Sequence, residues 1–180
     1  MSDILKPCPC ITRYGHNPVL AGTDVPYASS LVFNAGVIRW QEKYVMVFRN
    51  DYNHMEGSRF EGTNIGIAES DDGIAWKVGP KPCFDIKDEK IQALFDTPKG
   101  EIIRCYDPRL TVIDGEAHMT FAVDTKHGLR GGIAKTTDFE HFEVLSLSVP
   151  DNRNMVLFPE KINGMYMRLE RPMPIYSRGK

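Results

Sequence analysis

The chain has 180 residues, of which 42% are hydrophobic and 26% are charged. This composition is that of an ordinary globular protein, and the length is sufficient for one domain with a substantial core. The formal net charge is -2, from 22 Lys and Arg against 24 Asp and Glu. A nucleic-acid partner would call for a basic excess or a basic stripe, so the balance of charges excludes that class of function.

Targeting signals and metal motifs are also missing from the sequence. No apolar run approaches the length of a membrane span, and residues 1–6 contain no hydrophobic signal segment. We therefore expect a cytoplasmic protein with no membrane partner. The four cysteines and five histidines lack the spacing of a zinc site, so no metal is predicted.

Short apolar stretches separated by glycine, proline and polar clusters predict β-strands from the start of the chain. Residues 31–40 read as a strand, residues 41–43 as a polar turn and residues 44–49 as the return strand. Residues 50–63 are polar and predict a long insertion between strands. Insertions of this length in a compact domain tend to be functional or mobile.

Two more hairpins follow. Asp114-Gly115 separates the runs 109–113 and 117–123, and Asn163-Gly164 separates the runs 156–162 and 165–169. An Asp-Gly or Asn-Gly pair between such runs is a strong local signal for a tight hairpin turn.

Residues 64–76 resemble residues 131–142. Each segment predicts a strand, a polar turn and an aromatic residue that opens the next strand. Repeats of four short antiparallel strands are typical of β-propeller blades, although a β-sandwich also consists of short strands. The repeat favours the propeller. Even the smallest propellers close with about four blades, so we expect residues 1–180 to be the N-terminal, incomplete portion of a single propeller domain.

Asp107 is the leading candidate for chemistry, because it is a single carboxylate on what reads as a stiff turn before Pro108 and Arg109. Arg153 and Lys161 follow later without a neutralising run of acids. A lone acid facing cations suits an enzyme whose second reactant is an anion, and phosphate is the obvious candidate. A turn aspartate before proline is the structural alternative. Arg109 could pair with Asp107 or with a neighbouring blade.

Several segments in order carry a family resemblance: Phe33-Asn34-Ala35-Gly36-Val37, Phe48-Arg49-Asn50-Asp51, Tyr106-Asp107-Pro108-Arg109, residues 152–161 and Leu169-Glu170-Arg171-Pro172. Over nearly its whole length the chain resembles the β-mannoside phosphorylases of glycoside hydrolase family 130. The segment Glu170-Arg171-Pro172 looks closest to the mannosylglucose phosphorylase branch.

The resemblance implies an all-β, five-bladed β-propeller, of which this chain supplies about the first two and a half blades. It implies inverting phosphorolysis of β-mannosides, either β-1,4-mannosyl-glucose or manno-oligosaccharides, to α-D-mannose 1-phosphate. Inorganic phosphate would be the co-substrate, with no cofactor. The active site would lie in the central pit of the ring.

The resemblance also assigns roles to residues. Asp107 is implied to be the general acid, acting through the 3-hydroxyl of the mannosyl unit. The implied sugar-binding residues are Asn34, Arg49, Asn50 and Asp51, with Arg59 as a candidate for the acceptor sugar. The implied phosphate-binding residues are Arg153, Asn154, Lys161 and Arg171.

Two alternatives to the phosphorylase stay open. One is a β-mannoside hydrolase of the same fold, against which Arg153 and Arg171 argue because water needs no cationic cradle. The other is a truncated, inactive half-propeller. Uncovered blade edges and faces recruit partners, so we expect self-association or pairing with a missing C-terminal half.

Overall fold

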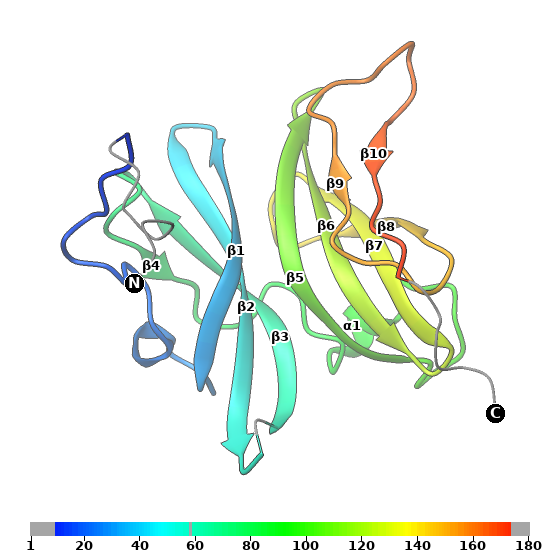
Figure 1. The fold of residues 1–180 in the computed structure, drawn as a ribbon, viewed down its shortest axis with the longest axis horizontal. Helices are drawn as coiled ribbons and strands as arrows, with labels where there is room; N and C mark the ends of the chain where they lie inside the picture. Colours follow the sequence, from blue (N-terminus) through cyan, green and yellow to red (C-terminus); the bar gives the residue numbers. More distant parts are fainter. Residues whose placement is uncertain (1–9, 58, 174–180) are drawn as a thin grey trace, which may run out of the picture.

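The computed structural model describes residues 10–57 and 59–173, and nearly all of its regular structure is β. Two four-stranded antiparallel sheets lie side by side, with a two-stranded sheet beyond the second (Figure 1). Blade 1 consists of β1 (Leu31–Trp40), β2 (Lys43–Met55), β3 (Arg59–Ser70) and β4 (Lys77–Val78). Blade 2 consists of β5 (Ile102–Ile113), β6 (Glu116–Thr125), β7 (Gly128–Thr136) and β8 (Glu143–Leu147). The third sheet pairs β9 (Val156–Leu157) with β10 (Arg168–Leu169).

In the described part of the chain, helical structure is limited to short segments, a 3-10 turn at Gly22–Asp24 and the helix α1 (Glu89–Gln92). Within residues 10–57 and 59–173, no helix has the length and apolar character needed to cross a membrane.

Each four-stranded sheet runs in chain order, which is the meander of a propeller blade, so the predicted repeat is confirmed. The hairpin predicted at Asp114-Gly115 joins β5 to β6, and both turn residues have positive φ, 52° and 80°. Two left-handed residues in a two-residue loop are the geometry that an Asp-Gly pair favours.

The long insertion predicted at residues 50–63 is wrong. This segment instead extends the β2–β3 ladder, with Asp51 paired to Thr63 and His54 paired to Phe60. The tip of this hairpin projects beyond the core, where Asn53 and His54 are exposed, whereas Asn50 and Asp51 are polar and buried. The third predicted hairpin is confirmed only in part, since Pro159 cannot donate to a ladder and β9 ends at Leu157.

The two blades close their polar turns with the same hydrogen bonds. Ser70 Oγ and Thr136 Oγ1 each accept the backbone N–H three residues on, at 2.8 and 2.9 Å. Asp72 and Asp138 each accept the backbone N–H groups two and three residues on. The sequence similarity of the two segments therefore reflects one repeated turn.

The main core lies between the blades and includes residues from both. Phe84 is fully buried and its ring contacts those of Phe95, Phe121 and Phe142. The rings of Trp40 in blade 1 and Phe139 in blade 2 meet edge to face at 5.8 Å.

The inner strands of the blades, β1 and β5, meet at the centre of the view (Figure 1). A Cβ at Gly36 would lie 2.8 Å from the backbone N of Leu110 and 2.9 Å from Cα of Arg109, so only glycine permits this approach. Arg109 Nη1 donates to the carbonyl of Asn34 at 3.1 Å, which confirms the contact expected with a neighbouring blade. This meeting of strands brings the candidate site together.

Candidate active site

Both inner strands carry a β-bulge at the same place. The pairing of β1 with β2 shifts after Phe33, and the pairing of β5 with β6 shifts after Tyr106. The next residues, Asn34 and Asp107, have φ of 51° and 55°. Asn and Asp tolerate this left-handed conformation better than other non-glycine residues, and bulges re-aim side chains. Asp107 therefore lies within a strand, where the sequence predicted a turn.

The third sheet repeats the arrangement. Its pairing shifts by one residue between Val156–Leu169 and the bridge that joins Asn152 to Pro172. Asn154 lies in this shift with φ of 56°. Asn34, Asp107 and Asn154 thus occupy equivalent positions in three successive blades.

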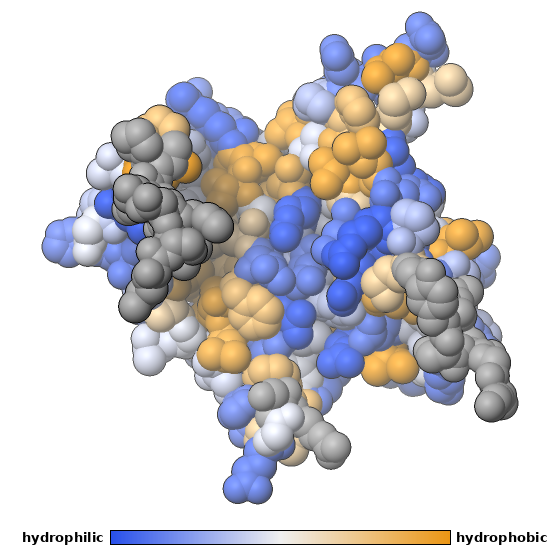
Figure 2. Space-filling model, in the orientation of Figure 1, coloured by the Kyte–Doolittle hydropathy of each residue, from blue (hydrophilic) through white to orange (hydrophobic). Residues whose placement is uncertain are grey.

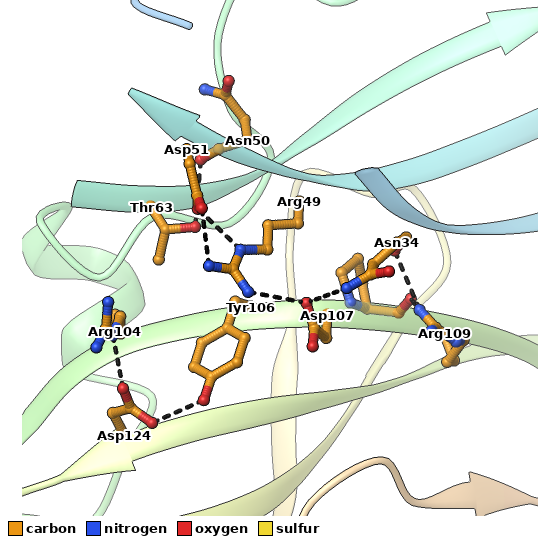
Figure 3. Close-up of polar contacts among 11 residues, drawn as sticks. Asn34, Arg49, Asn50, Asp51, Thr63, Arg104, Tyr106, Asp107, Arg109 and Asp124 are labelled. Atoms are coloured by element: carbon orange, nitrogen blue, oxygen red, sulfur yellow. Dashed lines mark hydrogen bonds and ion pairs between the residues drawn. The ribbon is translucent and has the colours of Figure 1, made fainter. Parts of the chain in front are cut away.

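Asp107 is held by its neighbour in blade 1 (Figure 3). Its Oδ1 accepts from Asn34 Nδ2 at 2.8 Å and from Arg49 Nη1 at 3.2 Å. Among the residues that the structure describes, no donor reaches Oδ2. One oxygen is anchored, and the other remains available to a substrate hydroxyl.

Arg49 is the most constrained cation of the site. Its guanidinium lies between the rings of Phe33 and Tyr106, with its Cζ 4.7 Å from each centroid, and it binds both oxygens of Asp51 at 2.8 and 2.7 Å. Burial acts to lower the pKa of Arg49, but the hydrogen bonds and charges of Asp51 and Asp107 outweigh it and raise the pKa. Arg49 is therefore a fixed positive charge beside Asp107.

Two other predicted sugar-binding residues face into blade 1. Asn50 and Asp51 are fully buried, and Asn50 Nδ2 donates to the carbonyl of Ala28 and to Asn64 Oδ1. Asp51 reaches the site through Arg49. The remaining candidate, Arg59, begins β3, but its side chain lies outside the described part of the structure.

Tyr106 and Asp124 are site components that the sequence did not reveal as such. The Tyr106 hydroxyl donates to Asp124 Oδ1 at 2.8 Å, and Arg104 Nε donates to Oδ2 at 2.6 Å. Burial, followed by the hydrogen bond and charge of Asp124, raises the pKa of Tyr106 to about 12. Arg104 and Asp124 are paired across β5 and β6. The bulge after Tyr106 shifts the register between this pair and the hairpin turn, so the pairing could not be read from the sequence.

Three of the four predicted phosphate ligands lie on adjoining segments. Arg153 is half-buried, and its effect on the Tyr106 phenol is to lower the pKa, against the larger effect of burial. Arg171 is exposed, and its backbone N–H donates to Asn152 Oδ1 at 3.1 Å. The strand register places Arg171 opposite Arg153, and Asn154 follows with its side chain exposed. This edge of the site is cationic.

Lys161 lies elsewhere. Its Nζ pairs with Asp114 Oδ2 at 2.7 Å and sits 4.8 Å from the centroid of the Tyr166 ring. Asp114 follows the end of β5, so extended strand on the order of 20 Å long separates it from Asp107. The structure does not bring Lys161 to the other candidates.

The site faces solvent at the junction of the blades. Figure 2 shows hydrophilic side chains gathered near the middle of this face, with hydrophobic side chains beside them. Within residues 10–57 and 59–173, no three His, Cys, Asp or Glu side chains form a group that could hold a metal ion. A separate cavity of about 630 Å³ between β3–β4 and the β7–β8 turn is lined by none of the predicted site residues.

Residues 8–177 match the glycoside hydrolase family 130, described as beta-1,4-mannooligosaccharide phosphorylase. The chain belongs to this family. It is 30% identical over 177 residues to the beta-1,4-mannooligosaccharide phosphorylase of Ruminococcus albus, covering 93% of this chain and 49% of that protein. It is 31% identical over 109 residues to the beta-1,2-mannobiose phosphorylase of Listeria innocua, covering 60% of this chain and 28% of that protein.

Solved structures of the family share the fold. The Listeria innocua beta-1,2-mannobiose phosphorylase in complex with beta-1,2-mannobiose aligns with a TM-score of 0.73 and 22% identity, covering 92% of this chain and 59% of that one. A second structure is described in terms of family 130 glycoside hydrolases that target beta-1,2 mannosidic linkages in Candida mannan. It is also 22% identical, with a TM-score of 0.66, and the alignment covers 86% of this chain and 48% of that one.

These relatives are five-bladed β-propellers, and this chain covers about half of the ring. The predicted family and fold class are confirmed. The chain spans about half the length of the Ruminococcus albus protein that it matches.

Proposed function

We propose that this chain carries the acid and part of the phosphate site of an enzyme for inverting phosphorolysis of β-mannosides. The product is α-D-mannose 1-phosphate, with inorganic phosphate as co-substrate and no further cofactor. The observation that carries the proposal is Asp107, whose Oδ1 is anchored by Asn34 and Arg49 while no donor among the described residues reaches Oδ2.

In the proposed reaction, the proton of the Asp107 carboxyl passes to the mannosyl 3-hydroxyl, whose own proton passes to the glycosidic oxygen. The bond from the anomeric carbon to that oxygen breaks, and a phosphate oxygen bonds to the carbon from the opposite face. The leaving sugar departs as a neutral alcohol. A general acid of this kind typically contributes about 10²–10⁴ in rate.

The surrounding carboxylates support phosphate over water as the nucleophile. An inverting hydrolase needs a second carboxylate that is free to activate water. Both oxygens of Asp51 bind Arg49, and Asp124 is engaged by Arg104 and Tyr106. Neither Asp51 nor Asp124 is therefore free to act as a base. Phosphate is already an anion and needs no base, and the positive charge of Arg153 would attract it.

For the substrate we propose a β-1,4-linked mannoside, either mannosyl-glucose or a manno-oligosaccharide. The support is the family description together with the Ruminococcus albus relative, whose match covers 93% of this chain. The competing linkage is β-1,2, which the Listeria innocua relative represents.

The test is to supply β-1,4-mannobiose, β-1,4-mannosyl-glucose and β-1,2-mannobiose, each with and without phosphate, and to identify the products. We expect α-mannose 1-phosphate from a β-1,4 substrate only when phosphate is present. Release of free mannose at the same rate with and without phosphate would contradict the proposed phosphorylase activity and favour the hydrolase. Faster turnover of β-1,2-mannobiose would contradict the linkage alone.

We also propose that the 180-residue chain self-associates or binds a C-terminal counterpart, and that it is a weak enzyme alone. Large apolar side chains of the third sheet and of the segment that joins its strands are exposed, with Val156 at 49%, Leu169 at 61% and Met165 at 67%. Light scattering on the chain and on Met165→Glu tests this, with association expected for the first and reduced for the second. An active monomer with a sharp thermal transition would contradict it.

A further inference from the structure

Three charged residues form a connected row that ends at the candidate acid (Figure 3). Asp51 accepts from Nε and Nη2 of Arg49 at 2.8 and 2.7 Å, and Arg49 Nη1 donates to Asp107 Oδ1 at 3.2 Å. The side chain of Asp51 has no exposed surface, so a sugar in the site cannot touch it while blade 1 stays folded. Any part that Asp51 plays at the site must therefore pass through Arg49.

The guanidinium of Arg49 can tilt or rotate, and different neighbours restrict each movement. The rings of Phe33 and Tyr106, each 4.7 Å from Cζ, restrict tilting toward either ring. Rotation within the guanidinium plane is restricted by Asp51, because two parallel hydrogen bonds to one carboxylate fix an edge of the fork. With Nε and Nη2 held in this way, Nη1 is kept in the direction of Asp107.

Asp51 is itself fixed by the backbone. Strand β2 lies between β1 and β3, where Asp51 is paired with Leu31 and with Thr63. The carbonyl of Asp51 also accepts from the backbone N–H of Ser30 at 2.8 Å. Asp51 therefore gives Arg49 a fixed point of attachment on a central strand of the blade.

The direction of Nη1 decides which oxygen of Asp107 can carry a proton. A guanidinium has N–H donors and no acceptor, so the oxygen that it faces must accept. Asn34 Nδ2 donates to the same Oδ1 at 2.8 Å. A proton on the Asp107 carboxyl is therefore directed to Oδ2, which no donor among the described residues reaches.

We propose that Asp51 is a positioning residue for the acid step and makes no contact with the sugar. It sets the rotation of Arg49, which keeps Asp107 Oδ1 as an acceptor and leaves the transferable proton on Oδ2. The inference deepens the proposed function and rests on it in one respect, namely that Asp107 is the general acid.

The first test needs no turnover and can use the 180-residue chain. A guanidinium whose rotation is blocked gives separate, slowly exchanging Nη signals in NMR spectra. We expect separate Arg49 signals in wild type and merged signals in Asp51→Asn, because an amide offers one acceptor and one donor to the two arms of the fork. Merged signals in wild type, or separate signals in Asp51→Asn, would overturn the positioning role.

The second test is kinetic and is made with the C-terminal counterpart present. Asp51→Asn should lower kcat for the preferred mannobiose about 10- to 100-fold, because a misplaced acid transfers its proton poorly. The KM for mannobiose and the KM for phosphate should stay within about twofold. A dinitrophenyl β-mannoside has a leaving group that departs without a proton, so its turnover should fall by less than about threefold.

Ser70→Ala is the matched control for loss of a buried polar contact in blade 1. Ser70 is 5% exposed, and its Oγ accepts from the backbone N–H of Gly73 at 2.8 Å. Extended strand on the order of 20 Å long separates Ser70 from Thr63, the residue paired with Asp51. The control should lower stability and leave kcat within about twofold, whereas a loss equal to that of Asp51→Asn would contradict the inference.

A double-mutant cycle asks whether Asp51 acts on the acid. Asp51→Asn should add nothing to Asp107→Asn, because the acid that it positions is already gone. Additive losses in the cycle, or equal losses for mannobiose and the dinitrophenyl mannoside, would show that Asp51 does not act through Asp107.

Failure of the inference can be told from failure of the proposed function. Wild-type kcat in Asp107→Asn overturns the proposed acid, and this inference with it. If Asp107→Asn loses activity while Asp51→Asn keeps kcat and raises the KM for mannobiose, Asp51 binds the sugar and only the positioning role is overturned.

Discussion

Blade 1 and blade 2 share a backbone frame and differ in the side chains that they place on it. Both inner strands bulge at the same position, with Asn34 in blade 1 and Asp107 in blade 2 in the left-handed conformation. The amide of the first donates to the carboxylate of the second at 2.8 Å. At the same position of the repeat, blade 1 therefore supplies a hydrogen-bond donor and blade 2 supplies the candidate acid.

The second strands differ in the same way. Arg49 in β2 corresponds by register to Ala122 in β6, and Asp51 corresponds to Asp124. The Arg49–Asp51 pair is nearly inaccessible, with side chains 16% and 0% exposed, while Arg104 and Asp124 are 45% and 22% exposed. Blade 1 therefore buries a charge network that blade 2 leaves open to solvent.

The largest effect on activity should come from giving the bulge of blade 2 the same side chain as the bulge of blade 1. Asp107→Asn should lower kcat by about two to four orders of magnitude, because it removes the proposed general acid. Stability should change little, since Asn34 shows that an amide fits this backbone position. Phosphorolysis rates and melting curves test both statements. Wild-type turnover in the variant would assign Asp107 a structural role.

The two arginine–aspartate pairs should differ sharply in stability. Arg49→Met leaves Asp51 buried and unpaired, so the free energy of unfolding should fall by about 3–5 kcal/mol. Arg104→Met in blade 2 is the matched control and should cost about 1 kcal/mol or less.

Arg49→Met with Asp51→Leu should recover part of the loss, because no buried charge is then left alone. Denaturant unfolding of all three variants makes the comparison. Equal costs for the two arginines would mean that burial does not distinguish the pairs.

The hydroxyl that distinguishes Tyr106 from Phe33 predicts a pH effect. The folded-state pKa of Tyr106, about 12, is raised from 10.0 chiefly by burial. A raised pKa favours the neutral phenol, so this stability is fully present below about pH 10 and is lost as the pH rises through about 12. The contribution is about 2–3 kcal/mol.

The free energy of unfolding of wild type should therefore fall more steeply than that of Tyr106→Phe between about pH 9 and pH 12. The buried thiol of Cys83, whose pKa burial raises to about 12, is present in both proteins and cancels in the difference. Parallel pH profiles would show that the phenol ionises freely in the folded state.

The close approach of the inner strands predicts a smaller effect. Gly36→Ala places a methyl group 2.8 Å from the backbone of β5, which must shift, at a cost of about 1–3 kcal/mol. Gly15→Ala is the control, since a Cβ there meets nothing within 4 Å. Thermal unfolding distinguishes them, and a neutral Gly36→Ala would mean that the blades separate easily.

The smallest effect concerns the repeated polar turn. Phe139 has φ of 59° where blade 1 has Gly73 with φ of 75°. Phe139→Ala loses packing and keeps the backbone strain, whereas Phe139→Gly loses the same packing and relieves the strain. We expect the glycine variant to be more stable by about 1 kcal/mol in denaturant unfolding. The reverse order would show that the turn carries no strain.

Much of the fold could be predicted because its signals are local. Alternating strands, the Asp114-Gly115 turn and the repeated polar turn are each specified within a few residues. The polar segment 50–63 misled because polar side chains do not show whether the backbone leaves its ladder, and Asn50 and Asp51 are polar yet fully buried within it. The residue types of the site were visible in the motifs, including Asn34, Arg49 and Asp107.

The assembly of the site was not visible, for a physical reason. Asn34 and Arg49 reach Asp107 over separations of 73 and 58 residues, contacts that exist only once two blades pack. The stacking of Phe33 and Tyr106 on Arg49 and the burial of Asp51 depend on the same packing. Lys161 is close to Arg153 in sequence, but its side chain pairs with Asp114 and lies away from the other candidates.

The sequence by itself determined the blade repeat, the family and the set of polar residues, because strand period, turn chemistry and motif order are properties of adjacent residues. The tertiary structure alone decided which of those residues meet. Bulges shift the pairing by one residue, and one residue of shift decides which face of a strand a side chain takes. The positions that aim Asn34, Asp107 and Asn154 are therefore set by pairing between strands.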